Sequence, residues 1–195
     1  MIVFSDISKN VNKSVEAMND EYLIVIADVI VAAAKKKKKI LIIGNGGSNA
    51  DAQHIAAELT DQRGLNKPSI RVVTQCSTAQ MTSISNEMDL STSTLHFIQS
   101  WGEEGDIIIF LSANDNSLKL NTLKIIDVAR KKKMKIISIT GLNDPFINAV
   151  DYPIEINSEE THIIQIGAMM VMHYIAEVIE KTLYIFDRKN TELMM

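Results

Sequence analysis

The sequence contains little cysteine and little proline, with one cysteine, Cys76, and three prolines in 195 residues. A single cysteine excludes an internal disulfide, which is typical of a protein kept in a reducing cytoplasm. The chain also has no low-complexity stretch and no Pro-rich or Gly-rich linker that would separate two domains. We therefore expect a single domain over residues 1–195, located in the cytoplasm.

The features of a secreted, membrane or nucleic-acid-binding protein are missing as well. The N-terminus lacks the basic start and apolar core of a signal peptide. The longest apolar run near it, residues 22–34, is interrupted by Asp28 and is too short to span a bilayer. The net charge of −4 argues against a general nucleic-acid surface. We expect neither a membrane nor a nucleic acid as a partner.

Short apolar runs alternate along the chain with helical patterns. The predicted strands are residues 40–43, 70–74, 107–111, 136–139 and 154–156. The predicted helices between and after them are residues 49–62, 77–85, 92–101, 118–133 and 159–184. Strands that are solidly apolar and alternate with helices favour a parallel sheet covered on both faces. The sequence therefore predicts an α/β fold, a three-layer sandwich around a five-stranded parallel sheet in flavodoxin-like order.

A long helix is expected over residues 6–34, before the first strand. One stripe of apolar residues alternates spacings of four and three, which is typical of a helix that packs against a partner helix. It consists of Val11, Val15, Met18, Tyr22, Val25 and Val29. A second apolar face carries Leu23, Ile26 and Ile30. Such a helix either meets another subunit or lies between two layers of its own domain.

Two basic runs stand between a predicted helix and the strand that follows it. They are residues 35–39, all lysine, and residues 130–135, which contain one arginine and four lysines. Cations are favourable at the C-terminal end of a helix, because its partial charge is negative there. The sequence alone favours solvated helix ends over a nucleic-acid patch.

The glycine-rich stretch Gly44-Asn45-Gly46-Gly47-Ser48 separates the first strand from the helix after it. A strand, a glycine turn and a helix N-terminus in this order form a potential anion cradle, in which Ser48 caps the helix or binds a ligand. The turn lacks both the third glycine of a dinucleotide fingerprint and the Gly-Lys-Ser/Thr ending of a nucleotide P-loop. His54 and Glu58 follow four residues apart, on one face of the helix. A plain tight turn and a solvated helix face remain the alternatives.

Two more segments carry polar side chains where a parallel sheet binds its ligands. Ligands bind beyond the carboxyl ends of the strands, and residues 112–117, Ser-Ala-Asn-Asp-Asn-Ser, follow the third strand there. Helix capping by Ser117 accounts for only one of these polar groups. On the last predicted helix, Gln165 and His173 are about two turns apart and face roughly the same way. Their surroundings are almost entirely apolar, and a lone histidine there is more often a core residue than a catalyst.

The motif GNGGS-x-x-DAQH-x-AAEL, the serine-containing loop and the late T-x-x-x-Q with a following His resemble the phosphoheptose isomerases, which are sugar-isomerase (SIS) domain enzymes. The resemblance covers nearly the whole chain. It implies conversion of sedoheptulose 7-phosphate to D-glycero-D-manno-heptose 7-phosphate for ADP-heptose and lipopolysaccharide core synthesis. It also implies a homotetramer with sites built between subunits, and no nucleotide or redox cofactor.

The same resemblance assigns roles to individual residues. The catalytic base falls on Glu58 and the catalytic acid on His173. The zinc that some members bind would be held by His54, Glu58, Gln165 and His173. Sugar-phosphate binding falls on Asn45, Gly46, Gly47, Ser48, Ser112, Asn114, Ser117, Thr161 and Gln165.

Several positions depart from the family pattern. They are Gln62 for an arginine, Gln75 for an aspartate, Asn114 for a serine, Asp115 for a glycine and Ala168 for a histidine. These changes bear on the substrate and on activity. A non-catalytic relative in the same family is a tetramer that binds the replication initiator DnaA, which is the competing hypothesis. The presence of both Glu58 and His173 favours the enzyme.

Overall fold

The structure is a computed structural model that describes the chain except residues 1–2, 61–68, 76, 88–89, 114–118 and 194–195. Four of the departures and predicted contacts therefore lie outside the described residues: Gln62, Asn114, Asp115 and Ser117.

A five-stranded sheet forms the centre of the fold, and all neighbouring strands pair in parallel. The strand order is β2-β1-β3-β4-β5, which is the flavodoxin-like order expected from the sequence. The strands are β1 (Lys39–Gly44), β2 (Arg71–Thr74), β3 (Ile107–Ser112), β4 (Lys135–Gly141) and β5 (Tyr152–Ile156). Each predicted strand is thus present, with its bounds shifted by at most two residues.

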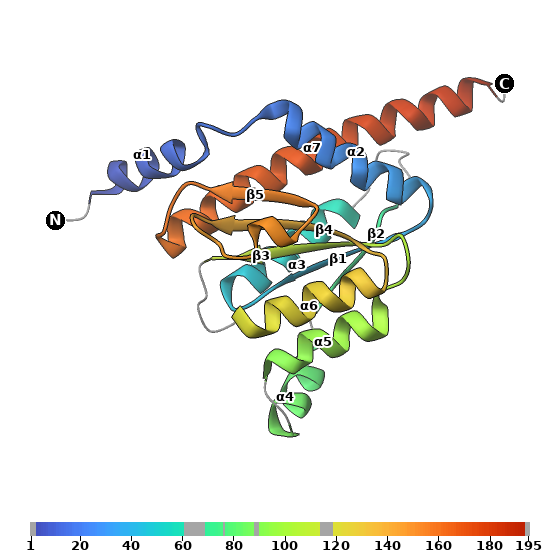
Figure 1. Ribbon diagram of the computed structural model, residues 1–195. Coiled ribbons are helices and arrows are strands. Elements are labelled where there is room, and N and C mark those ends of the chain that lie inside the picture. Colours follow the sequence, from blue (N-terminus) through green and yellow to red (C-terminus); the bar gives the residue numbers. More distant parts are fainter. Residues whose placement is uncertain (1–2, 61–68, 76, 88–89, 114–118, 194–195) are drawn as a thin grey trace.

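Helices cover both faces of this sheet, as the apolar strands require (Figure 1). One face packs against α2 (Asp20–Lys35), α3 (Gly47–Thr60) and α7 (Thr161–Leu193). The other packs against α5 (Leu90–Trp101) and α6 (Lys119–Lys131), and α4 (Thr78–Glu87) lies outside α5. A short 3₁₀ turn, η2 (Ile147–Ala149), precedes β5. The three-layer α/β sandwich is confirmed.

Branched aliphatic side chains explain why the strands are buried on both sides. Ile40, Ile42, Ile107 and Ile109 belong to the core on the α2–α7 face, while Ile108 belongs to the core on the α5–α6 face, and all five are fully buried. Because successive side chains of a strand point to opposite faces, a continuous apolar run supplies both cores. The polar turns after the strands are left at the carboxyl edge.

The single helix expected over residues 6–34 is wrong, because two helices form instead, α1 (Phe4–Val15) and α2. The side chain of Asn19 accepts a hydrogen bond from the Tyr22 N–H at 3.1 Å and caps α2. An N-cap of this kind starts a new helix, and Asp20 and Glu21 favour its first turn electrostatically. The stripe of heptad-like spacing is therefore interrupted.

The second apolar face of α2, rather than its first, is buried in the core. Leu23, Ile26 and Ile30 are 4% exposed or less, whereas Val25 of the heptad-like stripe is 50% exposed. Both α1 and α2 contact α7. The alternative of a helix lying against layers of its own fold thus holds for one side of α2.

The last helix, α7, is longer than predicted and extends to Leu193. Its segment Thr161–Leu183 is long and apolar enough to cross a membrane, but 44% of that segment is buried inside the fold. It packs against α1, α2 and α3. A buried core helix has the same length and composition, so this segment is weak support for a membrane span.

A buried ion pair closes the amino edge of the sheet. Lys39 Nζ lies 2.9 Å from Asp106 Oδ2 and 2.7 Å from Glu103 Oε2, and the Asp106 side chain is fully buried. Burial alone would lower the pKa of Lys39, but its hydrogen bonds to Glu103 and Asp106 outweigh burial and raise that pKa above its ordinary value. The ion pair joins the start of β1 to the turn before β3.

Candidate active site

The glycine-rich turn after β1 is tight, and α3 begins within it. Gly46 has φ +54°, a left-handed conformation that glycine adopts without strain. A β-carbon at Gly44 would meet the backbone of Ser48, so the chain can fold back only with glycine there. Because α3 begins at Gly47, Ser48 lies in the first helical turn, and the expectation that it stands at the N-cap is wrong.

Hydrogen bonds within this turn decide which of its groups face solvent. The N–H of Ser48 donates to Asn45 O at 3.0 Å, and the N–H of Asn49 donates to Gly46 O at 3.1 Å. Ser48 is buried, at 5% exposure, while Asn45, Gly46 and Gly47 are exposed. The accessible part of the predicted cradle is therefore residues 45–47.

Helix α7 crosses next to this turn and brings a polar side chain against it. A β-carbon at Gly47 would overlap Nε2 of Gln165. Glycine at position 47 therefore leaves room for the end of the Gln165 side chain, in addition to its place in the turn. The structure brings the predicted residues Gln165 and Gly47 together, although they are more than a hundred residues apart in the chain.

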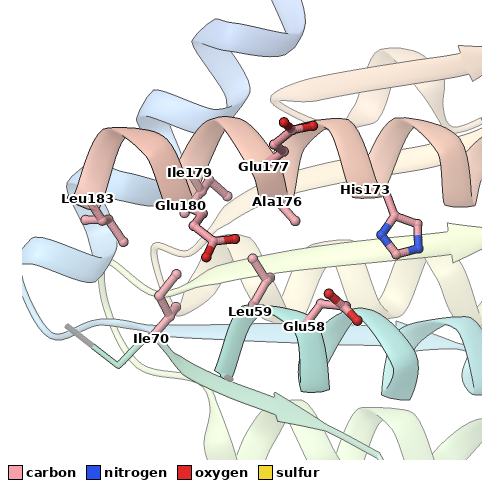
Figure 2. A pocket seen from close by; sticks show the side chains of 9 residues that line it. All are labelled: Glu58, Leu59, Ile70, His173, Ala176, Glu177, Ile179, Glu180 and Leu183. Carbon is pink, nitrogen blue, oxygen red and sulfur yellow. The ribbon is translucent and has the colours of Figure 1, made fainter. Parts of the chain in front are cut away.

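Further along the same two helices, three titratable side chains meet. His54 Nε2 lies 3.9 Å from Glu58 Oε1. The rings of His54 and His173 have centroids 5.1 Å apart and lie edge to face, at 87°. Figure 2 shows the His173 ring and the Glu58 carboxylate directed toward one another between α7 and α3. His173 is exposed to solvent, so the alternative of a buried core histidine is wrong.

A pocket of about 350 Å³ begins at Glu58 and His173 and extends along α7 toward β2 (Figure 2). Its volume lies in the range of small-molecule sites. Its lining consists of Glu58, Leu59, Ile70, His173, Ala176, Glu177, Ile179, Glu180 and Leu183. Glu58 and His173, singled out from the sequence, thus share one concave surface.

The acidic side chains around the pocket differ in their surroundings. Glu177 pairs with Lys181 at 2.7 Å, and this hydrogen bond lowers the pKa of Glu177. Burial raises the pKa of Asp51 on α3, and the nearby His54 opposes that shift. Figure 2 shows the Glu177 side chain on the outer side of α7 and the Glu180 side chain directed toward Leu59 and Ile70.

Pocket residues on the C-terminal part of α7 were not predicted from the sequence. Glu177 and Glu180 follow His173 by four and seven residues, which is the spacing of one helix face. This spacing could have predicted from the sequence that Glu177 and Glu180 lie near His173. Ile70 was placed in a strand, and its position near the far end of the pocket depends on how β2 lies against α7.

The other predicted contact residues are spread along the carboxyl edge. Ser112 ends β3 and is half-buried, and Thr161 is the first residue of α7 and is exposed. Gln75, a departure from the family pattern, is buried, and its amide nitrogen donates to Ser93 Oγ while its oxygen accepts from Thr94 Oγ1 at 3.1 Å. Gln75 therefore holds the first turn of α5 against the sheet.

The predicted zinc set can be compared with this geometry. His54, Glu58, Gln165 and His173 supply two imidazoles, a carboxylate and an amide, which are donor types that zinc accepts. Among the described residues, however, no three His, Cys, Asp or Glu side chains are grouped as a metal site. The structure therefore does not show the predicted zinc site.

Comparison with known proteins gives consistent matches. The SIS domain family matches residues 4–141. A phosphoheptose isomerase of Thermodesulfovibrio yellowstonii is 34% identical over 143 residues, which cover 72% of this chain and 70% of that protein. A phosphoheptose isomerase of Sulfurimonas denitrificans is 32% identical over 143 residues, 72% of each chain. The solved structure of a phosphoheptose isomerase from Neisseria gonorrhoeae has a TM-score of 0.80 at 25% identity, covering 91% of this chain and 95% of that one.

Proposed function

Because the chain belongs to the SIS-domain family, and within it to the phosphoheptose isomerases, we propose that it interconverts sedoheptulose 7-phosphate and D-glycero-D-manno-heptose 7-phosphate. The observation that carries the proposal is the meeting of Glu58 and His173 at one pocket. The reaction needs one base at carbon and one acid at oxygen, and this pair supplies both. The product would serve ADP-heptose and lipopolysaccharide core synthesis in the cytoplasm.

The proposed reaction begins with proton transfer at two atoms of the ketose. The Glu58 carboxylate removes a proton from C1, and the electron pair of that C–H bond forms the C1–C2 double bond. Protonated His173 donates its proton to the C2 carbonyl oxygen, whose π electrons become the new O–H bond. The result is an enediol, with Glu58 protonated and His173 neutral.

The second half reverses the roles at the neighbouring atoms. Neutral His173 accepts the proton of the C1 hydroxyl, the C1 carbonyl forms, and Glu58 returns its proton to C2. Both side chains then have their initial protonation states, so no redox or nucleotide cofactor is consumed. Every step uses side chains of this chain, and none is assigned to zinc.

For the substrate phosphate we propose the carboxyl edge of the sheet. The exposed turn of residues 45–47 stands at the positive end of α3, which favours an anion. By resemblance, Ser48, Ser112, Asn114 and Ser117 would contribute further contacts to the phosphate. Gln165 and Thr161, both on α7, would bind the sugar.

We further propose that residues 1–195 act as one SIS domain in a homotetramer, with α1, α2 and α7 at the subunit interfaces. Apolar side chains left exposed on these helices support this assembly. They are Phe4, Ile24, Val25, Ile166 and Met170, each at least 40% exposed. Sedimentation at micromolar concentration tests it, and a monomer there contradicts the assembly.

The decisive experiment compares Glu58→Gln and His173→Gln with the unchanged protein. Each substitution should lower turnover by roughly a hundred- to ten-thousand-fold while substrate binding persists. Glu177→Gln is the matched control, because Glu177 lines the same pocket but is paired with Lys181. NMR of the sugar phosphate in heavy water follows both isomerisation and exchange of the carbon-bound proton.

Two results would contradict the proposal in different ways. If the unchanged protein gives neither product nor exchange with a panel of ketose phosphates, it is not this isomerase. Binding to DnaA would then be tested, although the relatives above do not favour that alternative. If both variants stay active, the reaction stands but the assignment of Glu58 and His173 is wrong.

A further inference from the structure

The two basic runs, nearly a hundred residues apart in the sequence, lie at one edge of the sheet. The strand register places Lys39 beside Arg71, and Lys135 beside Ile107, which in turn neighbours Ile40. Helices α2, α5 and α6 end at this same edge, on the right of Figure 1. We call this surface the basic edge and define it by Lys36, Lys37, Lys38, Arg71, Lys132, Lys133 and Lys135.

Three of these cations are held by backbone carbonyls and pair with no carboxylate among the described residues. Lys38 Nζ donates to Glu104 O at 2.7 Å, an Arg71 nitrogen donates to Lys37 O at 2.9 Å, and Lys132 Nζ donates to Gly102 O at 2.8 Å. A carbonyl satisfies the hydrogen bond but carries no net charge. These side chains are therefore ordered before a ligand arrives, which lowers the entropic cost of binding an anion.

The C-terminal ends of three helices offset part of the positive charge of the basic edge, because each helix end carries a negative charge of about one half of an elementary charge. Carboxylates offset another part of it. Glu104 is bound to Lys133 at 3.0 Å, and Glu103 is bound to buried Lys39. Cations still outnumber carboxylates here, although the whole chain has a net charge of −4. The excess positive charge is local to this edge.

An exposed aromatic residue precedes one of the contacts of this edge. Trp101, the one tryptophan of the chain, ends α5 and is 48% exposed. The adjacent Gly102 lies against the aliphatic stem of Lys132. Tryptophan and arginine are enriched at the centre of protein interfaces, whereas charged side chains such as lysine belong to the polar rim.

We propose that the basic edge docks an acidic segment of another protein, with Trp101 as its apolar anchor. Charge complementarity selects the partner. Glu103 and Glu104 stand exposed among the cations, at 73% and 69% side-chain exposure, and would face a continuous track of phosphates. A peptide can place separate carboxylates on the cations and an apolar residue on Trp101. Protein is therefore favoured over nucleic acid.

The test uses the emission of Trp101 as the readout. The probe is an acetylated and amidated nonapeptide with one central leucine and four glutamates on each side. We expect saturable change in emission at 50 mM salt, and a Kd on the order of tenfold weaker at 200 mM because screening increases. The pair Arg71→Gln with Lys132→Gln should weaken binding by a similar factor.

The charge-matched control is Lys9→Gln with Lys13→Gln on α1, which should leave the Kd within about twofold. If the Arg71 and Lys132 pair does not fold, as judged by circular dichroism, Lys36→Gln with Lys135→Gln replaces it, since both side chains are exposed. Absence of saturable binding, or equal weakening by the control pair, overturns the proposal. So does tighter binding of a nine-nucleotide oligothymidylate than of the peptide.

Discussion

Replacing Asp106 by alanine should test how the amino edge of the sheet is held together. The Asp106 carboxylate accepts the Lys39 N–H at 2.8 Å and the Glu103 N–H at 2.9 Å, and it pairs with Lys39 Nζ at 2.9 Å. The Asp106 side chain is fully buried, and that of Lys39 is 7% exposed. The substitution therefore leaves a buried ammonium with one exposed carboxylate partner and leaves two backbone donors without acceptors.

Removing one partner of a buried pair costs about 3–5 kcal/mol, because the remaining charge stays in a poorly solvated site. We expect Asp106→Ala to lower the free energy of unfolding by that amount. Lys39→Met should cost less, about 1–3 kcal/mol, since Asp106 keeps its two backbone hydrogen bonds. The double variant should lose less than the sum of the two single losses, because the pair is lost only once.

Urea unfolding of the unchanged protein, the two single variants and the double variant measures these differences. Lys181→Met is the control, because Lys181 belongs to an exposed ion pair and its loss should not lower the stability measurably. A loss below about 1 kcal/mol for Asp106→Ala would refute the reasoning. Turnover per folded molecule should stay unchanged, because Asp106 does not line the pocket and its bonds are to Lys39 and Glu103. A large fall in turnover would contradict that separation.

The same pair predicts a dependence on pH. Folding raises the pKa of Lys39, so the stability that it contributes is fully present below the ordinary lysine pKa of 10.5 and is lost as pH rises through the folded-state pKa. We therefore expect the unchanged protein to lose stability above pH 10.5 more steeply than Lys39→Met does. Parallel curves for the two proteins would contradict this sign.

Three further predictions concern the candidate site. Gly47→Ala should displace the Gln165 amide at a stability cost of about 0.5 kcal/mol or less, because the end of a flexible side chain can move, and should lower kcat/KM, whereas unchanged kinetics would show that Gln165 is not needed in its present place. Zinc should bind weakly to the His54 and His173 group, since an amide is a poor ligand, and elemental analysis after dialysis should find well under one zinc per chain. Asp115→Gly should tighten affinity for a sugar phosphate in calorimetry, because it removes a negative charge from the loop that the family uses for phosphate. Unchanged or weaker affinity would mean that Asp115 does not face the ligand.

Local sequence patterns predicted most of the fold because they act over a few residues. The apolar runs at Ile40–Ile43 and Ile107–Leu111 can be satisfied only by burial on two faces, and the alternating helices make the sheet parallel. The break between α1 and α2 was also encoded locally, by Asn19 followed by Asp20 and Glu21, but the continuous apolar spacing concealed it. Here the capping residue Asn19 predicts the start of α2 better than the heptad-like spacing of apolar residues does.

The sequence by itself determined which chemical groups are present and which edge of the sheet receives them, since the glycine turn follows β1 and Glu58 lies on the helix that the turn begins. Only the tertiary structure decided that His173 meets His54 and Glu58, that Gln165 lies against Gly47, and that Ser48 is buried. The packing of α7 on α3 brings together residues more than a hundred positions apart, and no local pattern specifies it. The convergence of the two basic runs has the same cause, because parallel strands bring the ends of separate helices to one edge.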